Sequence, residues 1–289
     1  MNTDKIALIT DSGADLSKEW TEKYPIYTIP YTITFSDGSY QDGVDIFPAD
    51  IYRRQVDEMP KTSLPSGAVI EDVFRQVKQD GYNKAIAIML SGGLSGCYQM
   101  TTLMAQDCED IEIAVFNSFS GSMGEGGIVL TVARLIEEGK SWEELLDLVP
   151  RVMKNTHVYF MVDTLQYLQK GGRIGKITAM AGTALGIKPI LEVDRETGEL
   201  SSVYKVRGRA AAMRKIVQTL QKYVEPGKRY NIMWAHGGIL EEGEKLAQMV
   251  REAFPEYETE YFGEIDCTLA SYVGPNLIGA AIQILDDDM

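Results

Sequence analysis

A continuous apolar run that ends in a glycine–serine turn constrains the fold of this chain more than any other feature. Residues Ala85–Leu90 read AIAIML, and a strand that is apolar at every position is typical of a parallel sheet buried on both faces. The next six residues contain three glycines and two serines, which favours a turn with exposed backbone N–H groups. A helical pattern then starts near Tyr98. This succession predicts that a small anion binds near Ser91 and Ser95, at a helix N-terminus.

Length and composition place the chain among two-domain globular proteins. It has 289 residues, of which 45% are hydrophobic, and no run of 18 apolar residues, so we expect neither a transmembrane helix nor stable membrane insertion. The first residues lack the pattern of a signal peptide, and three cysteines without metal-ligand spacing suit reduced thiols, which predicts a cytoplasmic protein. His157 and His236 are its two histidines, which excludes a His-rich metal site; we expect no metal and no cofactor.

Strands and helices alternate in the first half of the chain. Apolar strands are expected at Lys5–Thr10, Ile26–Phe35, Ala85–Leu90 and Ile113–Phe116, and helical periodicity is expected at Pro48–Met59, Gly67–Gln79 and Gly127–Glu138. The βαβα order predicts an α/β/α sandwich with a parallel sheet over residues 1–150.

The pattern changes near residue 150. Strands are expected at Val158–Val162, Ile190–Val193, Leu200–Val203, Tyr230–Ala235, Thr259–Phe262 and Ile278–Leu285, with a loop followed by a helix over 171–185 and helices at 210–223 and 241–253. A tight turn at Asp194–Gly198 joins two of these strands and indicates antiparallel pairing. We therefore expect a second α/β domain with a mixed sheet over residues 151–289, and a ligand pocket between the two domains.

Charge is distributed unevenly along the chain. The net charge of −14 argues against nucleic acid or an anionic membrane as the main partner. Residues 151–228, however, carry 14 of the 28 Lys and Arg residues and only six acidic residues, so this segment has a net charge of +8. The segment is either a solvated surface or a docking face for an acidic partner or a phosphate.

Hydroxyl side chains gather on two predicted loops of the same sheet. They are Thr62, Ser63, Ser66, Ser91 and Ser95. Hydroxyls together with turn N–H groups can hold a carboxylate without a positive side chain. A single Ser or Thr more often caps a helix, whereas Thr62 and Ser95 taken together, with glycines beside Ser95, favour a binding site.

A nucleophilic serine is the alternative interpretation. Ser95 would be the nucleophile of a hydrolase or acyl transferase, with His236 as its base. The nucleophile elbow has the pattern Gly-x-Ser-x-Gly, and this chain places Cys97 where the second glycine belongs.

No nucleotide-binding motif is recognisable. The run from Gly171 to Lys176 lacks the P-loop pattern, which would require Gly at position 170 and Ser or Thr at position 177. No Gly-x-Gly-x-x-Gly motif follows a strand, which argues against a kinase or a dehydrogenase. Two predicted loops instead present cations, which either lie on an ordinary surface or face an anion or a partner: Arg173, Lys176, Lys205, Arg207 and Arg209.

Seven motifs in order give the chain a family resemblance over nearly its whole length. They are TDSGADL at 10–16, KTSLPS at 61–66, SGGLSGCYQ at 91–99, SMGEG at 122–126, KGGRIG at 170–175, IKPIL at 187–191 and KVRG at 205–208. With these motifs the chain resembles the DegV family, bacterial fatty-acid-binding proteins that present acyl chains to a separate fatty acid kinase.

The resemblance implies specific roles for several residues. Thr62 and Ser95 correspond to the hydroxyls that hold the lipid carboxylate, and the acyl chain would enter a tunnel between the domains. Arg173 and Arg207 match arginines associated with kinase docking and phosphoryl transfer. Tyr272 stands where the family often has histidine, and its hydroxyl can donate to a carboxylate but cannot become cationic.

Together with these patterns, the resemblance implies a cytoplasmic lipid carrier that is not itself an enzyme. It would bind a long-chain fatty acid non-covalently, with Thr62, Ser95, Ser91 and Tyr272 at the carboxylate, and a partner kinase would form the acyl phosphate. A pure interaction protein with a vestigial pocket is the third interpretation.

Overall fold

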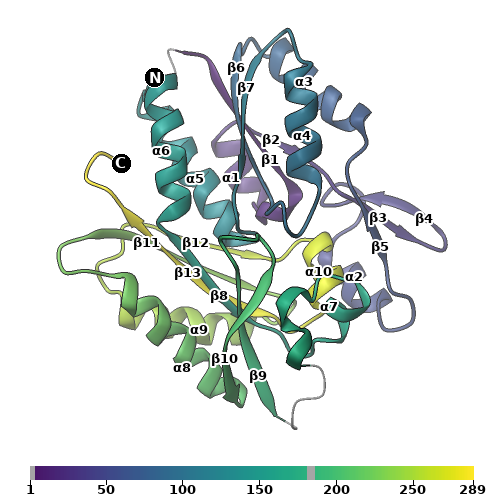
Figure 1. The fold of residues 1–289 in the computed structure, drawn as a ribbon, viewed down its shortest axis with the longest axis vertical. Helices are drawn as coiled ribbons and strands as arrows, with labels where there is room; N and C mark the ends of the chain where they lie inside the picture. The colour runs from purple at the N-terminus through teal and green to yellow at the C-terminus, as the bar shows by residue number, and fades with distance from the viewer. Residues whose placement is uncertain (1–3, 181–185) are drawn as a thin grey trace.

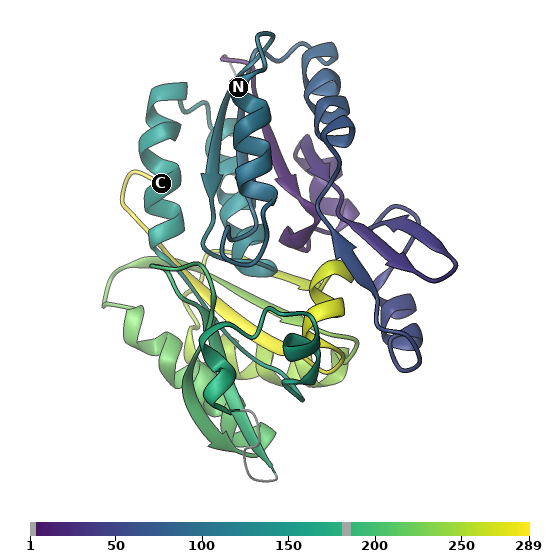
Figure 2. The same cartoon turned by 45° about the vertical axis from the view of Figure 1, so that its right-hand side comes forward.

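The computed structural model describes residues 4–180 and 186–289, which form two large sheets and one small sheet (Figure 1, Figure 2). The first large sheet is parallel, with the order β2-β1-β6-β7, as predicted. Its strands are Ile26–Ile29, Ile6–Asp11, Lys84–Met89 and Glu112–Asn117 in that order. Ile86 and Ile88 pack on one face of the sheet, and Ala85, Ala87 and Met89 pack on the other, so β6 is apolar throughout because both faces are buried.

Helices cover both faces of the parallel sheet. Helices α3 (Gly67–Gln79) and α4 (Cys97–Gln106) pack on one face, and α5 (Met123–Glu137) packs on the other. This arrangement confirms the expected α/β/α layers. Helix α4 begins at Cys97, directly after the glycine–serine turn, so the turn lies at the carboxyl end of β6 as predicted.

The predicted strand Ile26–Phe35 is two strands in two different sheets. Pro30 has no N–H to donate to a ladder, and after it the chain leaves the parallel sheet. The small antiparallel sheet has the order β4-β3-β5, with strands Gly38–Gln41, Thr32–Phe35 and Lys61–Ser63. Thr62 lies on β5, so the prediction that it belongs to a loop of the parallel sheet is wrong.

The second large sheet is mixed, with the order β10-β9-β8-β13-β11-β12. Its strands in that order are Leu200–Arg207, Ile187–Val193, Thr156–Met161, Ile278–Leu285, Arg229–His236 and Glu260–Glu264. Neighbours pair antiparallel except β11 and β12, and β9 and β10 form the hairpin expected around 194–198. Helices α8 (Arg209–Leu220) and α9 (Leu240–Ala253) cover its outer face.

The remaining helices are short, apart from α6. They are η1 (Ser12–Ala14), α1 (Lys18–Lys23), α2 (Pro48–Arg54), α6 (Trp142–Lys154), α7 (Gln166–Lys170), η2 (Gly175–Met180), η3 (Gln221–Tyr223) and α10 (Cys267–Val273). Of the helix expected within 171–185, only η2 is seen, and residues 181–185 lie outside the described residues. Neither α6 nor α10 was expected from the sequence.

Helix α5 packs against both large sheets, on the face of the mixed sheet that α8 and α9 leave free. Residue 150, where we predict the domain boundary, lies within α6, and the mixed sheet begins after it at Thr156. The division into domains 1–150 and 151–289 therefore stays a prediction. Over residues 4–180 and 186–289, no helix is both long enough and apolar enough to span a membrane.

Candidate functional site

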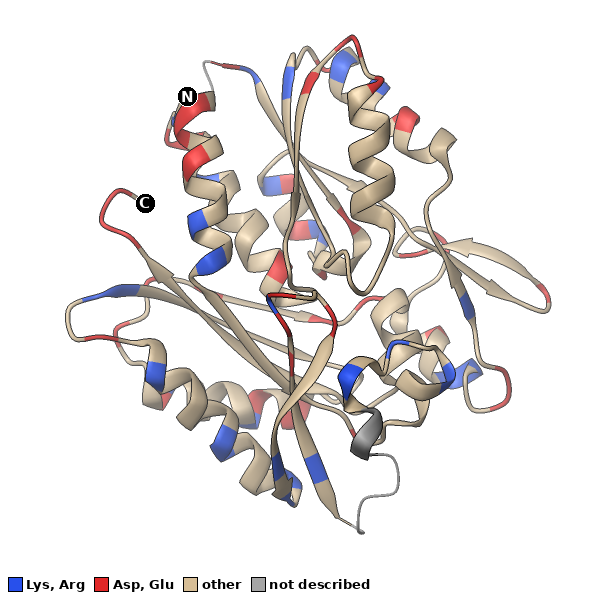
Figure 3. Ribbon diagram, viewed as in Figure 1, with Lys and Arg blue, Asp and Glu red and all other residues tan. Residues whose placement is uncertain are grey.

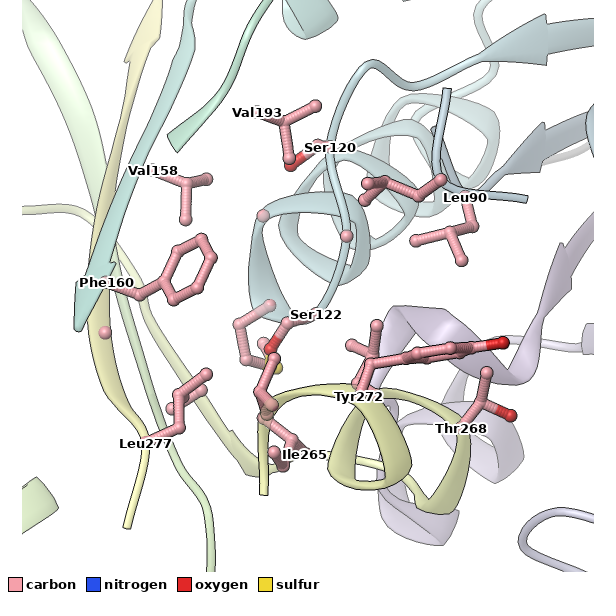
Figure 4. Close-up of a pocket in the computed structure, with 18 of the residues that line it drawn as sticks. Leu90, Ser120, Ser122, Val158, Phe160, Val193, Ile265, Thr268, Tyr272 and Leu277 are labelled. Carbon is pink, nitrogen blue, oxygen red and sulfur yellow. The ribbon is translucent and has the colours of Figure 1, made fainter. Parts of the chain in front are cut away.

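A cavity of about 280 Å³ lies between the two large sheets and helix α10 (Figure 4). Strands β8, β11 and β13 form one wall, and the ends of β6 and α5 form the other. Most of the lining is apolar: Leu90, Leu94, Met123, Val158, Phe160, Leu168, Val193, Leu200, Met233, Ala235, Ile265, Leu269, Val273, Leu277, Ala280 and Ala281. Small-molecule pockets span about 300–1,000 Å³. The cavity is close to the lower end of that range, and its lining suits a slender hydrocarbon.

Three hydroxyl side chains, here called the hydroxyl cluster, line one part of this cavity: Thr62, Ser95 and Tyr272. They come from β5, from the turn between β6 and α4, and from α10. The Thr62 and Tyr272 hydroxyls hydrogen-bond to each other. This bond uses one of their two protons, so the other proton remains available to an incoming acceptor.

Ser95 is held by two donors, which orients its own proton. The Tyr31 hydroxyl donates to Ser95 Oγ at 2.8 Å, and the backbone N–H of Cys97 donates to the same atom at 3.2 Å. A serine hydroxyl accepts at most two hydrogen bonds and donates one. With both acceptor positions occupied, the Ser95 proton is free for a ligand oxygen.

Arg173 is the cationic residue among the described residues that line the cavity. It is exposed, its guanidinium carbon lies 4.7 Å from the centroid of the Tyr272 ring, and its N–H groups donate to the carbonyls of Leu94 at 3.3 Å and Gly171 at 2.9 Å. These contacts fix a planar cation over one member of the hydroxyl cluster. The arrangement can hold an anion by hydroxyl donation, with one positive charge nearby.

Two buried carboxyl groups, those of Asp11 and Asp42, contact residues that position the hydroxyl cluster. Asp11 accepts N–H hydrogen bonds from Leu90 and Gly13, both at 2.9 Å, and burial raises the pKa of its carboxyl to about 7. The Tyr31 hydroxyl that holds Ser95 lies 3.3 Å from Asp11 Oδ2. Asp11 therefore ties β1 to the end of β6 and also contacts the residue that orients Ser95.

Asp42 holds the start of helix α10 through hydrogen bonds. Its carboxylate accepts the backbone N–H groups of Cys267 at 3.0 Å and Thr268 at 2.9 Å, and the Thr268 hydroxyl at 2.7 Å. It also accepts the Ser12 hydroxyl at 3.2 Å, and Ser12 Oγ in turn accepts the N–H of Tyr31 at 3.2 Å. Asp42 thus connects α10, which carries Tyr272, to Tyr31.

Ser91 does not line the cavity, contrary to its predicted role at the carboxylate. Its side chain is fully buried, and its hydroxyl donates to the carbonyl of Gly198 at 2.7 Å. Gly198 belongs to the turn between β9 and β10, so this hydrogen bond joins the parallel sheet to the mixed sheet. We therefore leave Ser91 out of the candidate headgroup site and assign it to the contact between the two halves.

The predicted pair of Ser95 and His236 is not assembled. His236 is buried, and a Cβ on Gly243 of α9 would lie 3.1 Å from the His236 Cβ, which places the imidazole on the outer face of the mixed sheet. Burial lowers the pKa of His236, and its Nδ1 has no hydrogen-bond partner in the described part of the chain. Ser95 is instead held by Tyr31 and Cys97. The described residues therefore do not form the Ser95–His236 pair on which the hydrolase interpretation depends.

Arg207 lies apart from the cavity. It ends β10, where it pairs in register with Ile187 of β9, and its side chain is exposed. Of the predicted site residues, the structure brings together Thr62, Ser95, Tyr272 and Arg173, and leaves Ser91 and Arg207 outside the group. Sequence reasoning missed Tyr31 and Asp42, since an isolated Tyr after a proline and an isolated Asp before a glycine carry no recognisable pattern.

Comparison with known proteins agrees with this architecture. The family model described as an uncharacterised protein of the DegV family matches residues 5–284. Two DegV domain-containing proteins from Clostridium acetobutylicum are 36% and 34% identical to this chain, each alignment covering 96% of this chain and 99% of the relative.

Solved structures of the same family superimpose closely. A fatty-acid-binding DegV family protein from Thermus thermophilus matches with a TM-score of 0.90 at 29% identity, covering 97% of this chain and 100% of that chain. DegV from Bacillus subtilis, described as a fatty acid binding protein, gives 0.88 at 26% identity, with 98% and 100% covered. A stearic-acid-binding protein from Eubacterium ventriosum gives 0.86 at 28% identity, with 96% and 98% covered. By sequence and by fold, the chain belongs to the DegV family.

Proposed function

We propose that this protein is a carrier that binds one long-chain fatty acid non-covalently and presents its carboxylate to a separate fatty acid kinase. One observation carries the binding part of the proposal: the cavity is apolar along most of its wall, and free hydroxyl protons converge beside a single cation in one part of it. A fatty acid has the same division into a hydrocarbon chain and one anionic group. Relatives of similar fold are described as fatty acid binding proteins, which supports the same ligand class here.

The acyl chain supplies most of the affinity in this proposal. A chain of roughly 16 carbons buries roughly 14 methylenes, and about 0.8 kcal/mol for each gives a gross gain on the order of 11 kcal/mol. Lost translational, rotational and chain freedom costs several kcal/mol of that gain. The hydroxyl cluster then serves chiefly to select an acid over a neutral headgroup. Its donors are effective because charge-assisted hydrogen bonds are stronger where water is displaced.

The headgroup assignment is tested by removing hydroxyls one at a time. Thr62→Ala and Ser95→Ala should each weaken the binding of a fatty acid about ten- to hundredfold, since a hydrogen bond to a charged group is lost. The binding of a fatty alcohol of the same length should change little. Calorimetric titration of both lipids measures this, and native mass spectrometry of the purified protein identifies any lipid that is already bound.

Ser39→Ala is the matched control for this experiment. Ser39 is exposed on β4 of the same small sheet that carries Thr62, and it does not line the cavity. Its loss should leave both affinities unchanged. Equal weakening of acid and alcohol by Thr62→Ala would reject the headgroup site, and a protein that binds neither lipid would reject the carrier proposal as a whole.

Presentation to a kinase rests on separate observations. The chain has no recognisable nucleotide-binding motif, so phosphorylation of a bound lipid needs another protein. Arg173 lies beside the hydroxyl cluster, where a phosphoryl group would meet the carboxylate. Figure 3 shows further Lys and Arg positions along α8 and towards the ends of β9 and β10, in the part of the chain with the net charge of +8.

Arg207 gives the clearest test of this step because it does not line the cavity. Arg207→Glu should reduce the rate at which a bacterial fatty acid kinase forms acyl phosphate on the bound lipid, while the affinity for the lipid stays unchanged. Arg173→Glu should impair both, because Arg173 lies beside the headgroup. Full phosphorylation of lipid on Arg207→Glu would remove Arg207 from the docking surface. No acyl phosphate with the unaltered protein would limit the function to binding.

A further inference from the structure

One buried hydroxyl in the wall of the cavity has no hydrogen-bond partner among the residues that the structure describes. Ser120 is 7% exposed and lines the cavity, and its Oγ makes no hydrogen bond with any residue that the structure describes. The Ser122 hydroxyl in the same loop donates to Asp15, and the Thr268 hydroxyl donates to Asp42. A hydroxyl in the wall of an apolar cavity that has no partner in the protein can bond to a polar group of a ligand, which would be stabilised there.

The backbone holds Ser120 in this position. Its N–H donates to Ser118 Oγ at 3.1 Å, and its carbonyl accepts the Ser118 hydroxyl at 3.1 Å and the N–H of Ser91 at 2.9 Å. The neighbouring residues Phe119 and Ser122 have φ values of 48° and 55°, in the left-handed region that side chains other than glycine seldom adopt. Strain of this kind is concentrated at functional sites, and the hydrogen bonds with Ser118 and Ser91 hold the Ser120 backbone in place.

The surroundings of the hydroxyl are open towards the acyl cavity. In Figure 4 the Ser120 oxygen lies next to Val193, with Val158 across from it, and all three residues line the cavity. A Cβ at position 124 would overlap both Ser120 Oγ and the Val158 side chain, so these two side chains pack side by side against Gly124. Both residues line the cavity, so a ligand that lies against Val158 passes close to the Ser120 hydroxyl.

A second depression adjoins the cavity at the same place. It has a volume of about 330 Å³, shares Ser120, Val158 and Val193 with the acyl cavity, and also includes the polar side chains His157, Glu192, Asp194 and Arg195. The wall between the hydrocarbon cavity and this polar region thus consists of two valines and Ser120. A substituent that reaches Ser120 would meet polar groups rather than more hydrocarbon.

We propose that Ser120 selects a fatty acid whose chain carries a hydroxyl group away from the carboxylate. This inference rests on the proposed function, since it assigns the chain substituent of the same ligand. The Ser120 hydroxyl and the ligand hydroxyl form a hydrogen bond within the cavity, whereas the carboxylate remains at the hydroxyl cluster. A saturated chain without a substituent binds as well, but leaves Ser120 without a partner.

Titration with stearic acid and with a series of hydroxystearic acids, which differ only in the position of the hydroxyl, tests the proposal. At least one isomer should bind about three- to tenfold more tightly than the others, which is the range for one added neutral hydrogen bond. Ser120→Ala should abolish that difference without weakening the binding of stearic acid, and Ser120→Thr should restore part of it. Stearic acid reports the integrity of each variant.

The outcomes separate this inference from the proposed function. If stearic acid binds and no isomer is preferred, or if the preference survives in Ser120→Ala, the role of Ser120 is overturned and the carrier function stands. If neither stearic acid nor any isomer binds the unaltered protein, both proposals fail. Preference for one isomer, lost in Ser120→Ala and regained in Ser120→Thr, establishes the assignment.

Discussion

Asp11 ends β1 with a carboxyl group that is fully buried and has no cationic partner in the described part of the chain. Two backbone N–H groups donate to it, and these hydrogen bonds stabilise the ionised form. Burial outweighs them and raises the pKa to about 7. The folded protein therefore keeps a proton on Asp11 at pH values at which the unfolded chain has lost it.

This shift predicts how stability depends on pH. Because the pKa of Asp11 is higher in the folded state, its contribution to stability is present below about pH 4 and is lost as the pH rises towards 7. The free energy of unfolding should fall by up to about 1.4 kcal/mol per pH unit from this group within that range. Denaturant unfolding at a series of pH values measures the slope.

Asp11→Asn removes the titrating group and keeps one acceptor oxygen. Its slope between pH 4 and 7 should be shallower than that of the unaltered protein, and its stability at pH 4 lower by about 1–3 kcal/mol, because one buried N–H loses its partner. Asp57→Asn, at an exposed position, should change neither quantity. Identical slopes for Asp11→Asn and the unaltered protein would mean that Asp11 is already ionised in the folded state at pH 4.

At the scale of single elements, α10 shows how a seven-residue helix can be held firmly. The carboxyl of Asp266, at the start of the helix, accepts the N–H of Leu269 at 2.6 Å. Two carboxyls from the first half of the chain accept further N–H groups. Asp15 accepts the N–H of Asp266 at 2.7 Å, and Asp42 accepts the N–H groups of Cys267 and Thr268. Carboxyl oxygens at a helix N-terminus satisfy its free N–H groups whether or not the carboxyl is ionised. Distant residues thus fix the helix that carries Tyr272.

Asp42→Asn tests this positioning. The variant loses one acceptor oxygen and the charge, so α10 should shift and Tyr272 should leave its contact with Thr62. We expect the affinity for a fatty acid to fall about tenfold or more, with stability lower by about 1–3 kcal/mol. The affinity for a fatty alcohol should fall much less, since the apolar wall remains.

Comparison of the two lipids distinguishes positioning from general damage. A parallel loss for acid and alcohol in Asp42→Asn would mean that the cavity itself is disturbed and that Asp42 has no specific role at the headgroup. Asp57→Asn again serves as the control of equal chemistry at an exposed position.

Long apolar elements could be predicted from the sequence, and glycine-rich ones only in part. Strands β6 and β13 and helices α3 and α9 lie within about a residue of their predicted bounds, because their apolar periodicity is strong. Helix α5 starts four residues before its predicted start at Gly127. Its glycines resemble a loop in the sequence, yet they allow close packing: a Cβ on Gly127 would overlap Met233 Sδ, and one on Gly126 would overlap the carbonyl of Ala14.

At the scale of the whole molecule, the cavity lies where the two large sheets approach each other around α5. Two sheets with helices on their other faces, and a pocket lined from both, agree with the fold class expected from the order of elements. Thr62, Ser95 and Tyr272 reach one place from three distant segments; the residue pattern paired Thr62 with Ser95 in advance, and only the family resemblance added Tyr272. Local patterns could not, because periodicity carries no information on contacts between separate elements.

The parts of the site that escaped prediction depend on tertiary contacts. Tyr31 and Asp42 act through hydrogen bonds to residues far away in the chain. Ser120 lines the cavity, and its hydroxyl has no hydrogen-bond partner among the described residues. Ser91 shows the complementary case. Its turn was predicted correctly, but its hydroxyl donates to the carbonyl of Gly198 in the mixed-sheet half and does not line the cavity. A sequence pattern identifies the polar side chain, whereas the fold decides which partner reaches it.

Gly93 and Gly198 meet where the two halves touch. A Cβ at Gly93 would lie 2.6 Å from the Gly198 carbonyl oxygen, and Gly198 itself has φ +73°. Every missense change in a glycine codon adds at least one carbon atom, so any substitution at either position disturbs the contact between the two halves. Lineages that keep this closure are therefore expected to carry both glycines unchanged, even where the residues that line the cavity beside them vary.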